Sequence, residues 1–75
     1  MKVFRGNYDG RRYAVVAAKN QKDAAAALNM TVHSMRGFFY TMASHESEEA
    51  KKALACPGTV FVRGMKARKA EWLPI

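Results

Sequence analysis

The sequence predicts an α+β fold, a three-stranded antiparallel sheet in the element order ββαααβ with three helices packed on one face. The turn dipeptide Asp9-Gly10 lies between two strand-like runs and indicates a hairpin. Two short runs with helical spacing meet at Asn29, a residue type common in tight turns. A β-branched and aromatic run near the end predicts the last strand. A length of 75 residues leaves room for one domain, residues 1–75.

Residues 2–18 are expected to form the hairpin. Asp9-Gly10 supplies the positive φ values that a two-residue type I′ turn requires. Odd and even residues of a strand point to opposite sides of a sheet. We therefore expect one face of the hairpin to be buried against the helices.

Residues 20–43 are expected to form two helices joined by a tight turn. Asn20 suits the cap of the first helix and Thr31 that of the second, because both side chains accept backbone N–H groups. Asn29 occupies the turn position that needs positive φ. Three apolar side chains are expected to close the angle between the helices from inside: Leu28, Met35 and Phe38.

Residues 44–56 predict a third helix, for which Ser44 and Ser47 are alternative caps. The helix stops at Pro57-Gly58, a dipeptide that suits the two central positions of a type II turn. Residues 59–64 then predict a third strand beside the hairpin.

Residues 65–75 form a basic tail in this prediction. Trp72 and Leu73 are the large apolar residues within it. We expect these two side chains to pin the tail back onto the body of the protein.

The composition favours an anionic partner. Thirteen Lys and Arg against six Asp and Glu give a net charge of +7, which speeds encounters with polyanions and acidic protein surfaces. The lone Cys56 excludes an internal disulfide and fits a reducing compartment. No apolar run approaches the length of a membrane span, and the first residues lack the core of a signal peptide. We expect a cytoplasmic protein that does not bind membranes.

For catalysis the sequence offers little. The imidazoles are His33 and His45, and no Ser, Asp or Cys has a spacing that presents a nucleophile beside either one. These two residues and Cys56 do not make a metal site, and the glycines are scattered at turns instead of forming a phosphate loop. We expect no enzyme, no cofactor and no metal.

The central helix pair carries a resemblance. The pattern Ala25-x-x-Leu28-Asn29-Met30-Thr31-x-x-x-Met35-x-x-Phe38 resembles the helix-turn-helix of small transcriptional regulators and excisionase-like proteins. The resemblance implies a helix-turn-helix-like pair whose second helix faces the major groove through His33, Ser34 and Arg36. Since base edges are read mainly by Arg, Lys, Asn and Gln, these three residues predict limited base readout.

The whole chain also resembles small accessory proteins of bacteriophages. Lys-Val-Phe-x-Gly-x-Tyr-Asp-Gly-Arg-Arg near the start and Pro-Gly-Thr-Val-Phe-Val-Arg near the end carry this similarity. It implies a phage-encoded protein in the host cytoplasm. Proteins of this class bind DNA, or bind and disable host proteins, including CRISPR effectors and other defence enzymes.

The first hypothesis is a basic protein that holds duplex DNA mainly through its phosphates. The basic residues form two groups, near the first turn and near the end, which make one patch if they meet in space. Tyr8 and Tyr13 either stack on bases, if the sheet face is open, or pack in the core. The residues expected to contact phosphate are Arg11, Arg12, Arg63, Lys66, Arg68 and Lys69.

The second hypothesis is a phage-encoded inhibitor or adaptor that binds a host protein with an acidic surface. Four large apolar groups follow one another near the end of the predicted second helix: Phe38, Phe39, Tyr40 and Met42. One helix cannot turn all four inward, so either one remains on the surface as a protein or homodimer interface, or the third helix covers them all. The chain is then a monomer or a homodimer.

Overall fold

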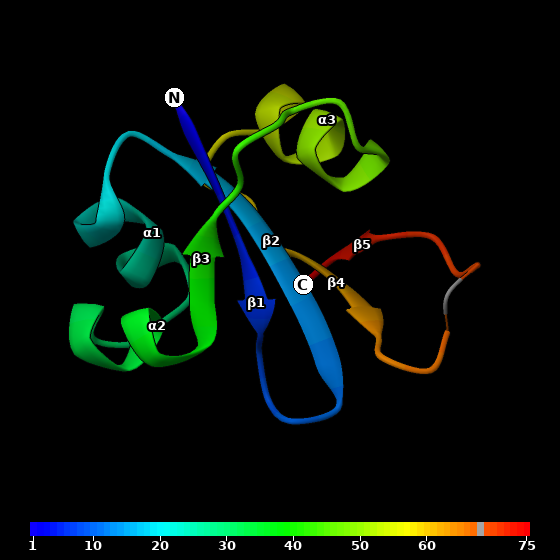
Figure 1. Cartoon of the computed structure of the whole chain (residues 1–75), viewed down its shortest axis with the longest axis horizontal. Coiled ribbons are helices and arrows are strands. Elements are labelled where there is room, and N and C mark those ends of the chain that lie inside the picture. Colours follow the sequence, from blue (N-terminus) through cyan, green and yellow to red (C-terminus); the bar gives the residue numbers. More distant parts are fainter. Residues whose placement is uncertain (68) are drawn as a thin grey trace.

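The computed structural model describes residues 1–67 and 69–75, and within them the chain forms five strands and three helices around one antiparallel sheet (Figure 1). The strand order is β3-β1-β2-β4-β5, with the β1–β2 hairpin at the centre. The elements are β1 (Lys2–Asn7), β2 (Arg12–Ala18), α1 (Gln21–Ala27), α2 (Val32–Phe38), β3 (Phe39–Thr41), α3 (Glu48–Ala55), β4 (Phe61–Gly64) and β5 (Leu73–Pro74).

The prediction of a three-stranded sheet is wrong, because the described residues contain two further strands, one at each edge. β3 comes from the segment predicted to continue the second helix. After the weak helix former Gly37, an aromatic and β-branched run leaves the helix and pairs with β1. β5 comes from the tail, where Leu73 pairs with Val62 of β4. β3 has three residues and β5 has two, and strands this short show no periodic pattern in the sequence.

Gly6 makes the docking of β3 possible. It lies opposite Phe39 in the β1–β3 register. A Cβ atom at this position would lie 2.6 Å from Cα of Phe39 and closer still to the carbonyl oxygen of Phe38. Only a residue without a side chain lets the two backbones approach this closely.

Helices cover both faces of the sheet, which corrects the prediction that all three pack on one face. Even-numbered residues of the hairpin, such as Phe4 and Val16, pack against α1 and α2. Odd-numbered residues, such as Val3 and Val15, pack against α3 and Trp72. In Figure 1, α1 and α2 lie together on one side and α3 lies apart from them. The physical reason is the continuous apolar run at the end of β2, which is buried on both faces.

The hairpin prediction is confirmed by six cross-strand pairs between β1 and β2, but its turn differs from the expected type. The N–H of Tyr8 donates to the carbonyl of Arg12 at 2.9 Å, so three residues form the loop instead of two. Gly10 has φ of +83°, whereas Asp9 does not have the positive φ that a type I′ turn requires.

The helix pair is confirmed, with its turn centred on Asn29 at φ 57°. The N–H groups of Asn29 and Met30 donate to the carbonyls of Ala26 and Ala25, which is the Schellman pattern of a helix end. Thr31 caps α2 by accepting the N–H of Ser34, and Asn20 caps α1 in the same way. The third helix begins after Ser47, one of the two predicted caps.

The predicted lining of the helix pair is only partly correct. Leu28 and Met35 are buried between α1, α2 and the sheet. Phe38 is 61% exposed, so its predicted place inside the pair is wrong. α2 ends at this residue, and Phe39 of the new strand enters the core in its place.

Candidate nucleic-acid interface at the hairpin loop

The loop between β1 and β2 is built by two polar side chains. Oδ1 of Asn7 accepts the N–H of Gly10 at 2.6 Å, and Oδ1 of Asp9 accepts the N–H groups of Arg11 and Arg12 at 3.0 and 2.9 Å. Short polar side chains commonly organise turns in this way. The loop is therefore held by its own residues, and its shape does not depend on a ligand.

Asp9 also fixes the side chain of Arg12. Its Oδ2 lies 3.0 Å from Nε and 2.9 Å from an Nη atom of Arg12, while the guanidinium lies 5.3 Å from the centre of the Tyr8 ring. The hydrogen bond from the N–H of Arg11 is the main cause that lowers the pKa of the Asp9 carboxyl below its ordinary value. Hydrogen bonds from the side chain and the N–H of Arg12 lower it further. Asp9 is thus ionised at neutral pH, and Arg12 balances its charge.

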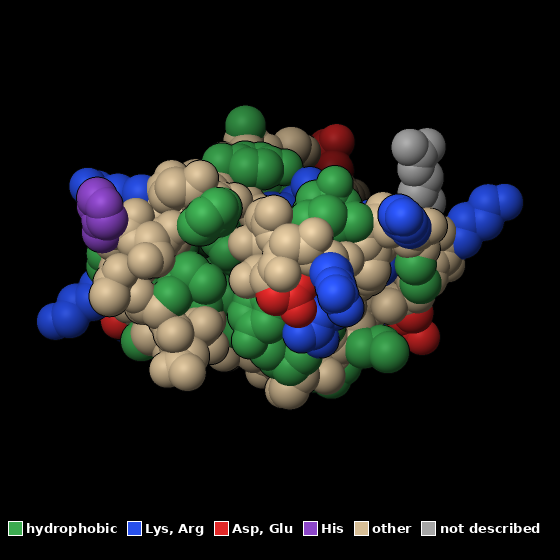
Figure 2. Space-filling view, turned by 90° about the horizontal axis from the view of Figure 1, so that it is seen from below, with side chains coloured by type: hydrophobic (Ala, Val, Ile, Leu, Met, Phe, Trp, Pro, Cys, Tyr) green, Lys and Arg blue, Asp and Glu red, His purple; other side chains and the backbone are tan. Residues whose placement is uncertain are grey.

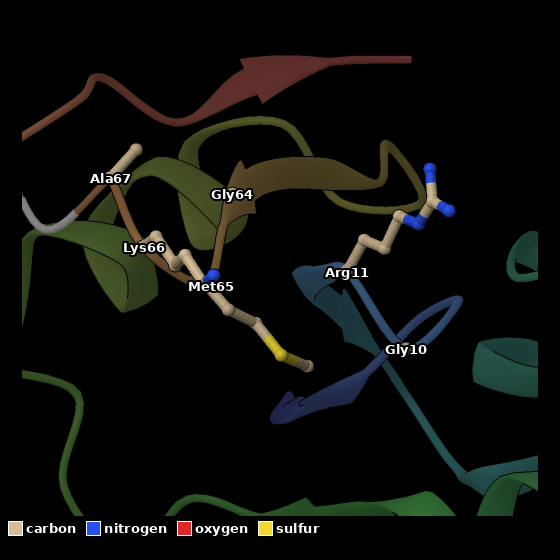
Figure 3. Close-up of a pocket in the computed structure, with 6 residues that line it drawn as sticks. All are labelled: Gly10, Arg11, Gly64, Met65, Lys66 and Ala67. Carbon is tan, nitrogen blue, oxygen red and sulfur yellow. The ribbon is translucent and has the colours of Figure 1, made fainter.

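The connection between β4 and β5 meets this loop. The N–H of Met65 donates to the carbonyl of Arg11 at 2.9 Å, which extends the pairing of Arg12 with Gly64. An open cleft of about 630 Å³ lies between the two segments. Figure 3 shows the side chains of Met65 and Lys66 extending toward the hairpin loop, with the Arg11 guanidinium directed away from them. Its lining residues are Gly10, Arg11, Gly64, Met65, Lys66 and Ala67.

A second cleft adjoins the other side of the same loop. It has a volume of about 290 Å³ and is lined by the exposed Phe38 together with the loop residues from Asn7 to Gly10. We call the two clefts and their rim the loop-end surface. Figure 2 views this end of the molecule from below the view of Figure 1, and hydrophobic and basic side chains adjoin there. Its defining side chains are Tyr8, Arg11, Phe38, Met65 and Lys66.

The loop-end surface keeps its positive charge. Among the described residues, the ion pairs join Arg5 to Glu49, Arg12 to Asp9 and Lys52 to Glu71. Within that part of the chain, Arg11 and Lys66 therefore have no acidic partner and are exposed at the cleft rim. Two cations on the rim of one cleft, with no acidic partner among the described residues, favour the approach of an anion.

Other predicted phosphate contacts lie elsewhere. Arg63 is half-buried on the α3 face, with its guanidinium 4.6 Å from the Trp72 ring centre. Lys69 is exposed on the connection to β5, and Arg68 lies outside the described residues. The structure thus places Arg11 and Lys66 on one cleft, ties Arg12 to Asp9, and separates Arg63 from them.

The residues predicted to read bases are on α2. His33 and Ser34 are exposed, but the Ser34 hydroxyl takes part in the cap of its own helix at 3.1 Å from Oγ1 of Thr31. Nε of Arg36 donates to Oε1 of Gln21 on α1 at 3.0 Å. None of these three residues lines the clefts of the loop-end surface.

The predicted protein-interface residues divide into two kinds. Phe38 is 61% exposed and Tyr40 is 54% exposed, whereas Phe39 is buried and Met42 packs against the core on the α3 face. The hydroxyl of Tyr40 accepts a hydrogen bond from Arg5 at 3.2 Å. The division follows from the strand: Phe39 faces α1 and α2, and Tyr40 faces the opposite side.

The α3 face holds a cluster of cations and rings that the sequence did not reveal. The Arg5 guanidinium lies 4.8 Å from the Tyr13 ring centre and 5.7 Å from that of Trp72. Nε of Arg5 also lies 3.2 Å from a carboxylate oxygen of Glu49 on α3. Arg5 lies over one face of the Tyr13 ring, and Tyr13 is half-buried against the core on this side, so Tyr13 packs instead of standing open. We call these residues with Arg63 the α3-side cluster.

Sequence reasoning missed Met65 as part of the candidate site and left the role of Tyr8 open. Nothing in the local sequence marks Met65, because its place depends on the pairing of β4 with β2. For Tyr8 a signal exists: it shares the even-numbered face of β1 with Phe4, and it packs at the edge of that core.

Comparison with protein-family models, with curated proteins and with solved structures finds no match. No helix in residues 1–67 and 69–75 has the length and apolar character needed to cross a membrane.

Proposed function

We propose that the protein binds DNA by holding the phosphate backbone at the loop-end surface. One observation carries the proposal: Arg11 and Lys66, far apart in the sequence, line the same cleft. Since neither is paired with an acid among the described residues, both charges are available to phosphate oxygens. These two residues support the prediction that basic residues near the first turn and near the end of the chain form one patch.

Base reading contributes little in this proposal. Arg36 is tied to Gln21, and the Ser34 hydroxyl is used within its own helix. His33 remains the side chain of α2 best placed to touch a base edge. Affinity should therefore depend weakly on sequence and strongly on salt, as is typical of phosphate contacts.

The test is fluorescence anisotropy of labelled random-sequence DNA at several salt concentrations from about 50 to 200 mM. We expect Arg11→Gln and Lys66→Gln each to weaken binding and to lower the slope of log affinity against log salt by about 1. The matched control removes the same charge from exposed residues outside the clefts, Lys19→Gln with Lys51→Gln. The variant that combines Arg11→Gln with Lys66→Gln should have a smaller salt slope than this double control. Equal salt slopes for the two double variants would contradict the proposal.

A second candidate function is an inhibitor or adaptor that binds a host protein. The observation that favours it is the exposure of Tyr40 on the edge strand β3, next to the exposed Phe38. Exposed aromatic groups at an edge strand suit a protein partner. The test is purification of the tagged protein from a bacterial host. A stoichiometric partner that Tyr40→Lys abolishes, with DNA affinity retained, would favour this candidate over the first.

A further inference from the structure

The loop-end surface combines charge with exposed apolar groups. Phe38 stands at the rim of the smaller cleft, and Met65 lines the larger one beside Arg11 and Lys66. A surface that only holds the phosphates of a duplex needs cations and does not need an exposed ring. In a duplex the faces of the bases are stacked on one another and do not reach such a ring.

We propose that the loop-end surface binds single-stranded DNA in preference to duplex DNA, with unstacked bases on Phe38 and in the Met65-lined cleft and with phosphates on Arg11 and Lys66. This inference rests on the proposed function and deepens it by naming the form of the nucleic acid. Proteins that bind single strands commonly combine a basic track with aromatic side chains on which bases stack.

The larger cleft has room for a base and a largely apolar lining. Its volume of about 630 Å³ lies within the range of small-molecule pockets, roughly 300–1,000 Å³. The glycines at positions 10 and 64 let a ligand approach the backbone, and most of the lining is apolar. The thioether of Met65 makes favourable contacts with aromatic rings.

The smaller cleft supplies the stacking ring. Phe38 is 61% exposed, and the half-buried Tyr8 lies beside it in the same lining. The guanidinium of Arg12 covers one face of the half-buried Tyr8 ring, so Phe38 is the more accessible of the two rings.

The loop between the clefts does not repel a strand that crosses it. Asp9 is its one acidic residue, and that carboxylate is in an ion pair with Arg12 at 2.9 Å. Arg12 is thereby occupied, so Arg11 and Lys66 are the cations left for phosphates on the path between the clefts. A strand passing from Phe38 to Met65 meets aromatic, basic and apolar groups in turn.

The experiment compares a labelled single strand of mixed sequence, about 15 nucleotides long, with the same strand annealed to its complement. We expect the single strand to bind at least about tenfold more tightly, because stacking of one base on an aromatic side chain accounts for a factor of this order. Phe38→Ser should lower the ratio of single-strand to duplex affinity about tenfold, and Phe38→Tyr should restore it. Leu73→Ser, which shortens a comparably exposed side chain on β5, is the matched control and should leave the ratio unchanged.

Each outcome decides between the two proposals. If duplex and single strand bind equally while Arg11→Gln still weakens both, the proposed function stands and the preference for single strands is wrong. Binding of neither form overturns both proposals. If the single strand is preferred but Phe38→Ser leaves the ratio unchanged in a variant that melts like the wild type, the stacking role of Phe38 is wrong. Quenching of 2-aminopurine placed in the strand, lost in Phe38→Ser, would be the direct sign of stacking.

Discussion

The α3-side cluster and the loop-end surface place the same kinds of side chain in opposite surroundings. In the α3-side cluster, Arg5 and Arg63 lie over the rings of Tyr13 and Trp72, and Glu49 of α3 balances Arg5. In the loop-end surface, Arg11 and Lys66 face solvent beside Met65.

The difference lies in what covers each region. α3 and the carboxyl-terminal segment close over the first cluster, so its cations and rings satisfy one another and stabilise the fold. The hairpin loop extends past the helices (Figure 1), and two of the cations around it, Arg11 and Lys66, remain exposed to solvent. The basic residues of the α3-side cluster therefore have a structural role, whereas our proposal gives Arg11 and Lys66 at the loop a binding role.

The largest effect is expected from Trp72→Ala, which removes the ring shared by Arg5 and Arg63. Trp72 is 1% exposed, and loss of a buried tryptophan costs about 3–5 kcal/mol of unfolding free energy. Urea denaturation measures this cost. Leu73→Ala, at the 57% exposed neighbour, should change stability by less than about 0.5 kcal/mol. Similar losses for the two variants would remove the distinction between the regions.

Gly6→Ala should have the next largest effect, because β3 connects the two regions: it directly follows Phe38 of the loop-end surface, and its Tyr40 accepts a hydrogen bond from Arg5 of the α3-side cluster. The new methyl group would collide with the backbone of Phe38 and Phe39, which cannot move as a flexible side chain would. We expect a loss of about 1–3 kcal/mol, as for other overpacked sites. Gly37→Ala is the control, since a Cβ atom there meets nothing within 4 Å. A Gly6→Ala variant as stable as the wild type would contradict the close approach of β1 and β3.

Arg63→Gln and Arg11→Gln test the comparison because each should change a different property, stability for Arg63→Gln and DNA binding for Arg11→Gln. Arg63→Gln should lower stability by about 1 kcal/mol through the lost contact with Trp72, and it should leave the salt dependence of DNA binding unchanged. Arg11→Gln should weaken DNA binding and leave the melting temperature unchanged within error. Melting curves and anisotropy titrations on the same samples give both quantities. The comparison fails if both variants alter the same property.

The smallest effect concerns Asp9 and pH. The folded protein holds the pKa of this carboxyl below 3.8, so near and below that pH the unfolded chain binds more protons than the folded one. The stabilisation is complete above the unfolded pKa and is lost as pH falls through the folded pKa. Asp9→Asn should therefore reduce stability at pH 7 and have a smaller effect at pH 2.5. Urea midpoints for wild type and variant at the two pH values measure the difference, and an equal change at both would contradict this origin.

Local chemistry accounts for the parts of the fold that the sequence predicted. Asn20, Thr31 and Ser47 cap helices through their own side chains, and Asn29 turns the chain with a backbone angle that few residues tolerate. Gly58, at φ +85°, follows Pro57 in a turn closed by the N–H of Thr59 and the carbonyl of Cys56. Each of these features depends on residues at most a few positions apart.

The rest depends on pairing between distant segments. β3 and β5 are short, and they become strands because β1 and β4 offer them hydrogen-bonding edges. The second face of the sheet was missed although the run from Ala14 to Ala18 is apolar throughout, a pattern typical of strands covered on both sides. In the candidate site, the charges were evident from the sequence. The proximity of Phe38 to the hairpin loop was not, because it follows from the register of β3 on β1.

The position of Trp72 gives the protein an internal optical probe. The chain has one tryptophan, and its ring lies against two guanidinium groups on the face covered by α3. Its emission should report on the integrity of that face, shifting to longer wavelength when water reaches the indole. Since Trp72 lines neither cleft of the loop-end surface, DNA that binds there should leave this emission largely unaltered. Tryptophan emission can thus report unfolding in the same sample in which labelled DNA reports binding.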